Sequence, residues 1–139
     1  ILTEGSKMVL TPTYHVFALY AAHQGAQQLE SYAETSILRH DEEAVPTLHV
    51  SASRAADGKI LVTVANLDAA HPAEAQVMLG GVKAAAVNGT VLCGTADARN
   101  TFTAPDAVQP KALSAVLTAE GFTATLPACS VAAFTVTPQ

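Results

Sequence analysis

Apolar and polar residues alternate with a period of two after Val45, and this pattern limits the possible folds more than any other feature. Leu48, Val50 and Ala52 alternate with polar neighbours, as in a β-strand with one buried face. Gly and Pro interrupt such runs about every eight to twelve residues, which is typical of a sandwich or jelly roll. We expect strands at 48–53, 60–67, 75–79, 84–87, 90–93, 115–117, 122–126 and 130–136.

Two dipeptides in this region favour hairpin turns. Asp57-Gly58 lies between the first two expected strands, and Asn88-Gly89 lies between the fourth and fifth. Asp-Gly and Asn-Gly are favoured in tight hairpins because both central residues adopt a positive φ. Asn88-Gly89-Thr90 also matches the glycosylation sequon, but we interpret it as a turn.

Composition limits which residues can form the core and which classes of partner the chain can bind. Among the 139 residues are 28 Ala, 14 Val and 13 Leu, so the core must be built mainly from Val and Leu. The net charge is -5 and the Lys and Arg residues are scattered, whereas phosphate backbones and anionic membranes attract basic patches. We therefore expect neither nucleic acid nor membrane as a partner, and no apolar run approaches the roughly 20 residues that span a bilayer.

The first 25 residues show a different sequence pattern from the rest of the chain. Thr11 is suited to an N-cap, Pro12 to the first helical position and Gly25 to the C-terminal end. These signals predict a helix from about 12 to 24. Its apolar residues surround the cylinder instead of forming one stripe, which is typical of a helix buried on most sides.

Residues 26–44 are mostly polar, and we interpret them as a connector with one short strand near 29–32. Glu30 and Glu34 have helical spacing, but nothing apolar nearby would raise either pKa, so we interpret the pair as solvated. The run from His40 to Glu43 contains metal-ligand types without a second histidine at ligand spacing. His15 and His23 are two helical turns apart, too far to share an ion.

Cys93 and Cys129 are the only cysteines. Two cysteines are too few for a disulfide framework and have no Cys-x-x-Cys spacing. We interpret them as buried thiols in preference to a bridge.

Two stretches resemble a known enzyme family. The first runs from Met8 to Phe17 and continues with Tyr20 and His23-Gln24, and it resembles the last barrel helix of the family 51 glycoside hydrolases, the α-L-arabinofuranosidases. The second resembles that family's C-terminal sandwich, and it comprises 50–54, 57–59, 64–68 and 100–110. The order and spacing of both stretches fit, so the resemblance covers nearly the whole chain and is weakest in residues 26–44.

The resemblance implies a parent enzyme with two parts. One is a (β/α)8 barrel that removes terminal arabinofuranosyl groups, with retention, from arabinan, arabinoxylan or derived oligosaccharides. The other is a jelly-roll domain packed beside the barrel. The expected fold class is therefore mainly β, a jelly-roll-like antiparallel β-sandwich preceded by one helix that belongs to the barrel in the parent. Residues 1–25 would be the remnant of the catalytic barrel, 26–44 the connector and 45–139 the sandwich.

The same resemblance implies that the catalytic residues lie outside this chain. Family members carry the acid/base glutamate in an Asn-Glu-Pro motif and the nucleophile in an Asp-Glu-Trp-like motif, both upstream of the final helix. Neither motif occurs here. Glu4 comes closest to that region but matches a loop leading into the last helix, so we assign no catalytic, cofactor-binding or metal-binding residue and expect the chain alone to be inactive.

Three functions compete on this sequence. We favour a noncatalytic domain that acts as a structural companion to the barrel. A carbohydrate-binding module would need exposed aromatic rings, yet residues 45–139 offer only Phe102, Phe122 and Phe134, the last of which alternates with apolar neighbours like a core residue. A free-standing immunoglobulin-like interaction domain would leave the helix unexplained and lacks the Cys-Trp-Cys pattern.

The helix also predicts partners. We expect it to lie between barrel and sandwich in the parent, so that the isolated chain either self-associates or occurs with the rest of its enzyme. The residues expected to mediate self-association are Tyr14, Val16, Phe17, Leu19 and Tyr20. Because the chain starts at Ile1 without a basic n-region, we expect it to be part of a longer protein, and the missing signal peptide does not identify its compartment. The scarcity of cysteines and the bacterial type of the family favour a cytoplasmic parent.

Overall fold

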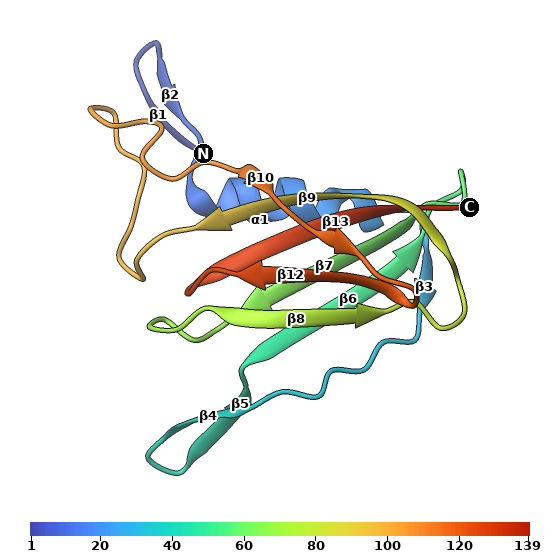
Figure 1. Ribbon diagram of the computed structural model, residues 1–139. Coiled ribbons are helices and arrows are strands. Elements are labelled where there is room, and N and C mark those ends of the chain that lie inside the picture. Colours follow the sequence, from blue (N-terminus) through green and yellow to red (C-terminus); the bar gives the residue numbers. More distant parts are fainter.

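Two antiparallel sheets form the body of the protein in a computed structural model that describes residues 1–139 (Figure 1). The larger sheet has six strands. In spatial order they are β10 (Lys111–Leu113), β9 (Ala84–Cys93), β13 (Ser130–Pro138), β7 (Ile60–Asn66), β6 (Leu48–Arg54) and β3 (Gln27–Leu29). Every neighbouring pair is antiparallel.

The smaller sheet has three strands and covers the inner face of the larger one. Its order is β11 (Val116–Leu117), β12 (Gly121–Leu126) and β8 (Ala73–Met78). The core between the sheets is centred on Phe122 and Phe134, whose ring centroids lie 4.8 Å apart. Its other buried members are Ile60, Val62, Val64, Val91, Ala124, Leu126, Ala132 and Val136. The predicted fold class, a mainly β antiparallel sandwich preceded by one helix, is thus confirmed.

The predicted turn at Asp57-Gly58 is confirmed between β6 and β7. Gly58 has a φ of +85°, and the Lys59 backbone N–H donates to Asp57 Oδ1 at 3.1 Å. The Ala55 N–H also donates to the Lys59 carbonyl at 2.9 Å, which closes the hairpin. This turn sets the register in which residues 60–66 pair with residues 48–54.

The predicted turn at Asn88-Gly89 is wrong, because both residues lie inside the continuous strand β9. Phe134 of β13 lies opposite Gly89. A Cβ atom on Gly89 would come within 2.5 Å of the Leu113 carbonyl oxygen and 3.0 Å of the Phe134 ring. Glycine at position 89 therefore does not form a turn; it allows β10 and an aromatic ring to lie close to the backbone of β9.

Helix α1 spans Pro12–Tyr20 and is followed by a 3₁₀ turn, η1, at Ala21–His23. It begins as expected, because the Tyr14 N–H donates to Thr11 Oγ1 at 3.3 Å. The α-helix ends earlier than the expected residue 24, since the chain tightens after Tyr20 and Gln24 is already extended. The helix lies against the outer face of the large sheet, over β9 and β13 (Figure 1).

Two hairpins and one short strand were not predicted. Hairpin β1–β2 joins Leu2–Glu4 to Lys7–Val9, and hairpin β4–β5 joins Ile37–His40 to Glu43–Pro46. Both project from the sandwich (Figure 1). Strand β10 lies in a stretch expected to be loop, and the strand expected near 29–32 is β3, at Gln27–Leu29. No helix is long and apolar enough to cross a lipid bilayer.

Candidate functional site

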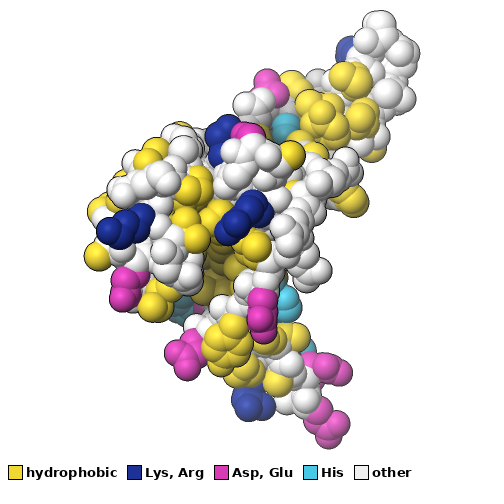
Figure 2. All heavy atoms as spheres, turned by 90° about the vertical axis from the view of Figure 1, so that its right-hand side faces the viewer, with side chains coloured by type: hydrophobic (Ala, Val, Ile, Leu, Met, Phe, Trp, Pro, Cys, Tyr) yellow, Lys and Arg dark blue, Asp and Glu magenta, His cyan; other side chains and the backbone are white.

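The acidic and histidine residues singled out from the sequence lie apart. Glu30 and Glu34 are exposed in a non-helical segment after β3, so their spacing does not bring the two carboxyl groups close together as it would on a helix. The run from His40 to Glu43 forms the exposed tip of hairpin β4–β5. No three side chains of metal-ligand type converge anywhere in the structure. Lys and Arg side chains are scattered over the face shown in Figure 2 and form no stripe there.

The most highly organised polar contacts lie where the N-terminal segment meets the sandwich. Asn100 is 3% exposed, and its Nδ2 donates to the Leu10 carbonyl at 2.8 Å and to the Val108 carbonyl at 2.9 Å. The Val108 N–H donates to Asn100 Oδ1 at 2.7 Å. One buried amide therefore ties the entry of α1 to the loop between β9 and β10.

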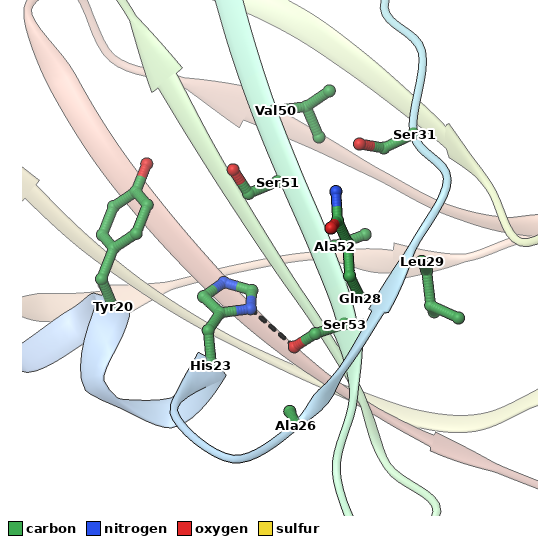
Figure 3. Close-up of a pocket in the computed structure, with 10 residues that line it drawn as sticks. All are labelled: Tyr20, His23, Ala26, Gln28, Leu29, Ser31, Val50, Ser51, Ala52 and Ser53. Atoms are coloured by element: carbon green, nitrogen blue, oxygen red, sulfur yellow. Dashed lines mark hydrogen bonds between the residues drawn. The ribbon is translucent and has the colours of Figure 1, made fainter.

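A second group of polar contacts ties the end of the helical segment to the large sheet (Figure 3). His23 Nδ1 lies 2.6 Å from Ser53 Oγ, and His23 Nε2 lies 3.1 Å from Thr63 Oγ1. Thr63 Oγ1 in turn donates to the Ser51 carbonyl at 3.5 Å. This donation leaves Thr63 as the acceptor for Nε2–H, so Ser53 donates to Nδ1 of a neutral imidazole. Burial lowers the pKa of His23 below its ordinary value of 6.5 and favours the same neutral form.

The Ser53–His23 pair is a structural contact. A nucleophilic serine needs an accessible hydroxyl and a base whose other ring nitrogen is oriented by a third group, usually a carboxylate. Ser53 is only 4% exposed, and a buried threonine stands where the carboxylate would be. One sequence signal could have revealed this cluster. The residues at 51, 53 and 63 carry hydroxyl groups at positions where the two strands face away from the core, and a histidine lies at the end of the predicted helix.

The helix held by these two polar contacts leaves an apolar surface uncovered. None of its nine residues is buried. Val16, Leu19 and Tyr20 are half-buried, whereas Phe17 is 73% exposed and Tyr14 is 39% exposed. Phe17 and Tyr14 are three positions apart on the helix, so their side chains lie on the same face. We call this surface the outer face of α1.

Comparisons with known proteins identify the family of this chain. Residues 1–130 match the family described as the α-L-arabinofuranosidase C-terminal domain. An intracellular exo-α-L-arabinofuranosidase of Bacteroides ovatus is 37% identical over 113 residues, which are 79% of this chain and 22% of that protein.

Solved structures agree over the whole fold. The GH51 arabinofuranosidase of Xanthomonas axonopodis pv. citri is 39% identical with a TM-score of 0.91, and the match covers 97% of this chain and 28% of that one. A family 51 α-L-arabinofuranosidase of Bifidobacterium longum is 25% identical with a TM-score of 0.79, covering 91% of this chain and 26% of that one. The chain therefore spans between a fifth and a third of the length of these relatives. It belongs to the family of C-terminal domains of the GH51 α-L-arabinofuranosidases.

Proposed function

We propose that this chain is a noncatalytic companion to a (β/α)8 barrel in an enzyme that removes terminal arabinofuranosyl groups. In this proposal, residues 1–25 complete the barrel, and the sandwich holds α1 in place against it. The single observation that supports this most directly is the outer face of α1. A helical segment fixed by partly buried polar contacts at both ends, yet carrying a phenylalanine that is 73% exposed, fits a surface built to be covered.

The assignment as noncatalytic rests on the chemistry of retaining glycosidases. These enzymes need two carboxyl groups about 5 Å apart, one protonated to donate to the leaving group and one ionised to attack. The pKa values of the Asp57 and Asp68 carboxyl groups are both lowered. Each pKa is lowered chiefly by local hydrogen bonds, from the Lys59 side chain and the Ala70 backbone respectively, and so neither carboxyl group is prepared as an acid.

An activity assay tests this part of the proposal. The purified chain is incubated with a chromogenic aryl α-L-arabinofuranoside, and we expect no turnover above a blank. The informative control is a panel in which each Asp or Glu is replaced singly by Asn or Gln. Turnover that one of these substitutions abolishes would place a catalytic carboxylate in this chain and overturn the assignment.

The covering of α1 is tested by the association of the chain in solution. Burying a phenylalanine side chain contributes about 1.5 to 3 kcal/mol, so we expect the chain to self-associate or to bind a hydrophobic dye in the absence of a barrel. Phe17→Ser should reduce both signals in light scattering and dye fluorescence. Met78→Ser is the matched control, because Met78 is 65% exposed but lies on β8, away from the helix. A wild-type chain that is monomeric and binds no dye would contradict the proposed cover.

A carbohydrate-binding function is the second candidate, and one residue outside the sandwich favours it. Tyr32 is 85% exposed and borders a cavity of about 450 Å³ between β6 and β8, lined also by Glu34, Glu74 and Gln76. An exposed aromatic ring offers an apolar face on which a sugar ring can stack, and carboxylate and amide groups can hydrogen-bond its hydroxyl groups. Calorimetric titration with arabino-oligosaccharides distinguishes the two functions. We expect no binding tighter than a Kd of about 1 mM, or roughly -4 kcal/mol, and tighter binding that Tyr32→Ala removes would favour the binding module.

A further inference from the structure

The two cysteines, far apart in the sequence, meet at one end of the large sheet. Cys93 is the last residue of β9, and its partner across the ladder in β13 is Ser130. Cys129 directly precedes Ser130. Both cysteines are free and half-buried, and both residues line the same cavity of about 310 Å³.

The chain neighbour of Cys129 pairs directly with Cys93, which brings the two cysteines close together. The Cα of Cys129 lies about 3.8 Å from that of Ser130, and Ser130 lies about 5 Å from Cys93 across the ladder. The two cysteine Cα atoms are therefore at most about 9 Å apart. Disulfide-linked residues have Cα separations of about 4.4 to 6.8 Å. The possible separations therefore include this range.

The backbone of Cys129 departs from regular strand geometry. In a regular strand, Cys129 would point to the opposite face from Ser130, and therefore from Cys93. Cys129 instead has a φ of +47°, and its N–H donates to the Asp68 carbonyl at 2.8 Å, outside the regular ladder. A left-handed residue breaks the alternation of side chains and is a strained choice for anything but glycine or asparagine.

We propose that Cys93 and Cys129 are a redox pair that closes to an intramolecular disulfide bond when the chain meets a low-molecular-weight disulfide. One thiolate attacks the reagent, forms a mixed disulfide and releases a thiolate. The second thiolate then attacks the mixed disulfide, forms the Cys93–Cys129 bond and releases the other half of the reagent. The protein loses two protons and two electrons, and the reagent is reduced to two thiols.

The bond would enclose the segment that supplies most of the small sheet. Strands β11 and β12 of the small sheet lie between residues 93 and 129, together with β10 of the large sheet. Joining the two ends of this segment restricts the unfolded chain, which raises the stability of the folded one. Pro12 and Val16 of α1 border the same cavity, so the oxidation state acts next to the contact between the helix and the sandwich.

Thiol counting and mass spectrometry on the native full chain test the proposal. The reduced chain is equilibrated with oxidised glutathione, and we expect free thiols to fall from two to none, a mass lower by two hydrogens and a higher Tm. Cys93→Ser and Cys129→Ser should each keep one thiol, which takes up one glutathione. Two glutathione adducts on the wild-type chain, a disulfide-linked dimer, or two unreacted thiols would each overturn the proposal.

Discussion

Replacing Asn100 should destabilise the chain more than any other single polar substitution in a loop. Asn100→Ala removes all three hydrogen bonds of the buried amide and leaves the Leu10 carbonyl, the Val108 carbonyl and the Val108 N–H without their partner. A buried polar group left unsatisfied costs about 1 to 3 kcal/mol. Val108 is 6% exposed whereas Leu10 is half-buried, so the two groups of Val108 carry most of the cost, and we expect a loss of about 3 kcal/mol.

Urea unfolding followed by far-UV circular dichroism measures this loss. With an m-value of about 1 to 3 kcal/mol per molar urea, the midpoint should fall by about 1 to 3 M at an unchanged m-value. Thr103→Ala is the control in the same loop, because Thr103 is exposed and its hydroxyl contacts only Thr101. It should stay within about 0.5 kcal/mol of wild type.

An aspartate at position 100 separates lost hydrogen bonds from lost packing. Asn100→Asp keeps an acceptor for the Val108 N–H but loses both donated bonds and buries a charge. Burial raises the pKa of such a carboxyl group in the folded state. Its protonated form regains one donor, so this variant should gain stability relative to Asn100→Ala as the pH falls. If Asn100→Ala stays within 0.5 kcal/mol of wild type, water replaces the amide and the reasoning fails.

Three further outcomes follow from other contacts. The pKa of His23 is lowered in the folded state from 6.5, so its contribution to the free energy of unfolding should be fully present above pH 6.5 and decline as the pH falls below that value. Urea unfolding at several pH values should show this decline in wild type but not in His23→Gln. Gly89→Ala should destabilise the chain by several kcal/mol, since its Cβ would lie 2.5 Å from a backbone oxygen. Gly80→Ala places its Cβ within 4 Å of no atom, so its only cost is the strain of an alanine at a φ of +56°. Thermal unfolding should show a larger fall in Tm for Gly89→Ala than for Gly80→Ala. Phe134→Ala should cost about 3 to 5 kcal/mol, because this side chain is 1% exposed, and a loss below 1 kcal/mol would mean that the core collapses around it.

Local sequence patterns predicted the sheets because the apolar residues that alternate along each strand are the ones that pack in the core. The alternation of Ala132, Phe134 and Val136 appears in the structure as three side chains that are at most 1% exposed. The turn at Asp57-Gly58 was predictable because its hydrogen bonds join residues within five positions of one another. In both cases the interactions that decide the structure are short in sequence.

Asn88-Gly89 shows why the same reasoning fails elsewhere. The dipeptide favours a turn, but residues 84–93 pair with β13 along its whole length, and this long ladder outweighs the preference of two residues. A glycine that allows a positive φ and a glycine that allows close packing are identical in the sequence. Only the Phe134 ring and the Leu113 carbonyl next to Gly89 distinguish them.

The polar contacts of the helical segment were beyond prediction for a different reason. His23 lies 30 positions from Ser53 and 40 from Thr63, and Asn100 lies 90 positions from Leu10. No local periodicity links such residues, and each alone resembles an ordinary surface polar group. Their burial exists only once α1 has docked on the outer face of the large sheet.

These hydrogen bonds fix the position of the helix, although its apolar side chains are not fully buried against the sheet. Hydrogen bonds with strict geometry fix both ends of the helical segment, at Leu10 and at His23. Apolar burial, the larger source of free energy, is incomplete, because Val16 and Tyr20 are only half-buried and Phe17 is largely exposed. A helix needed only by the sandwich would be expected to turn its phenylalanine toward the sheet. The proposed function accounts for this orientation, because a helix held with its phenylalanine outward fits a second apolar surface, and the polar contacts would fix the side from which that surface approaches.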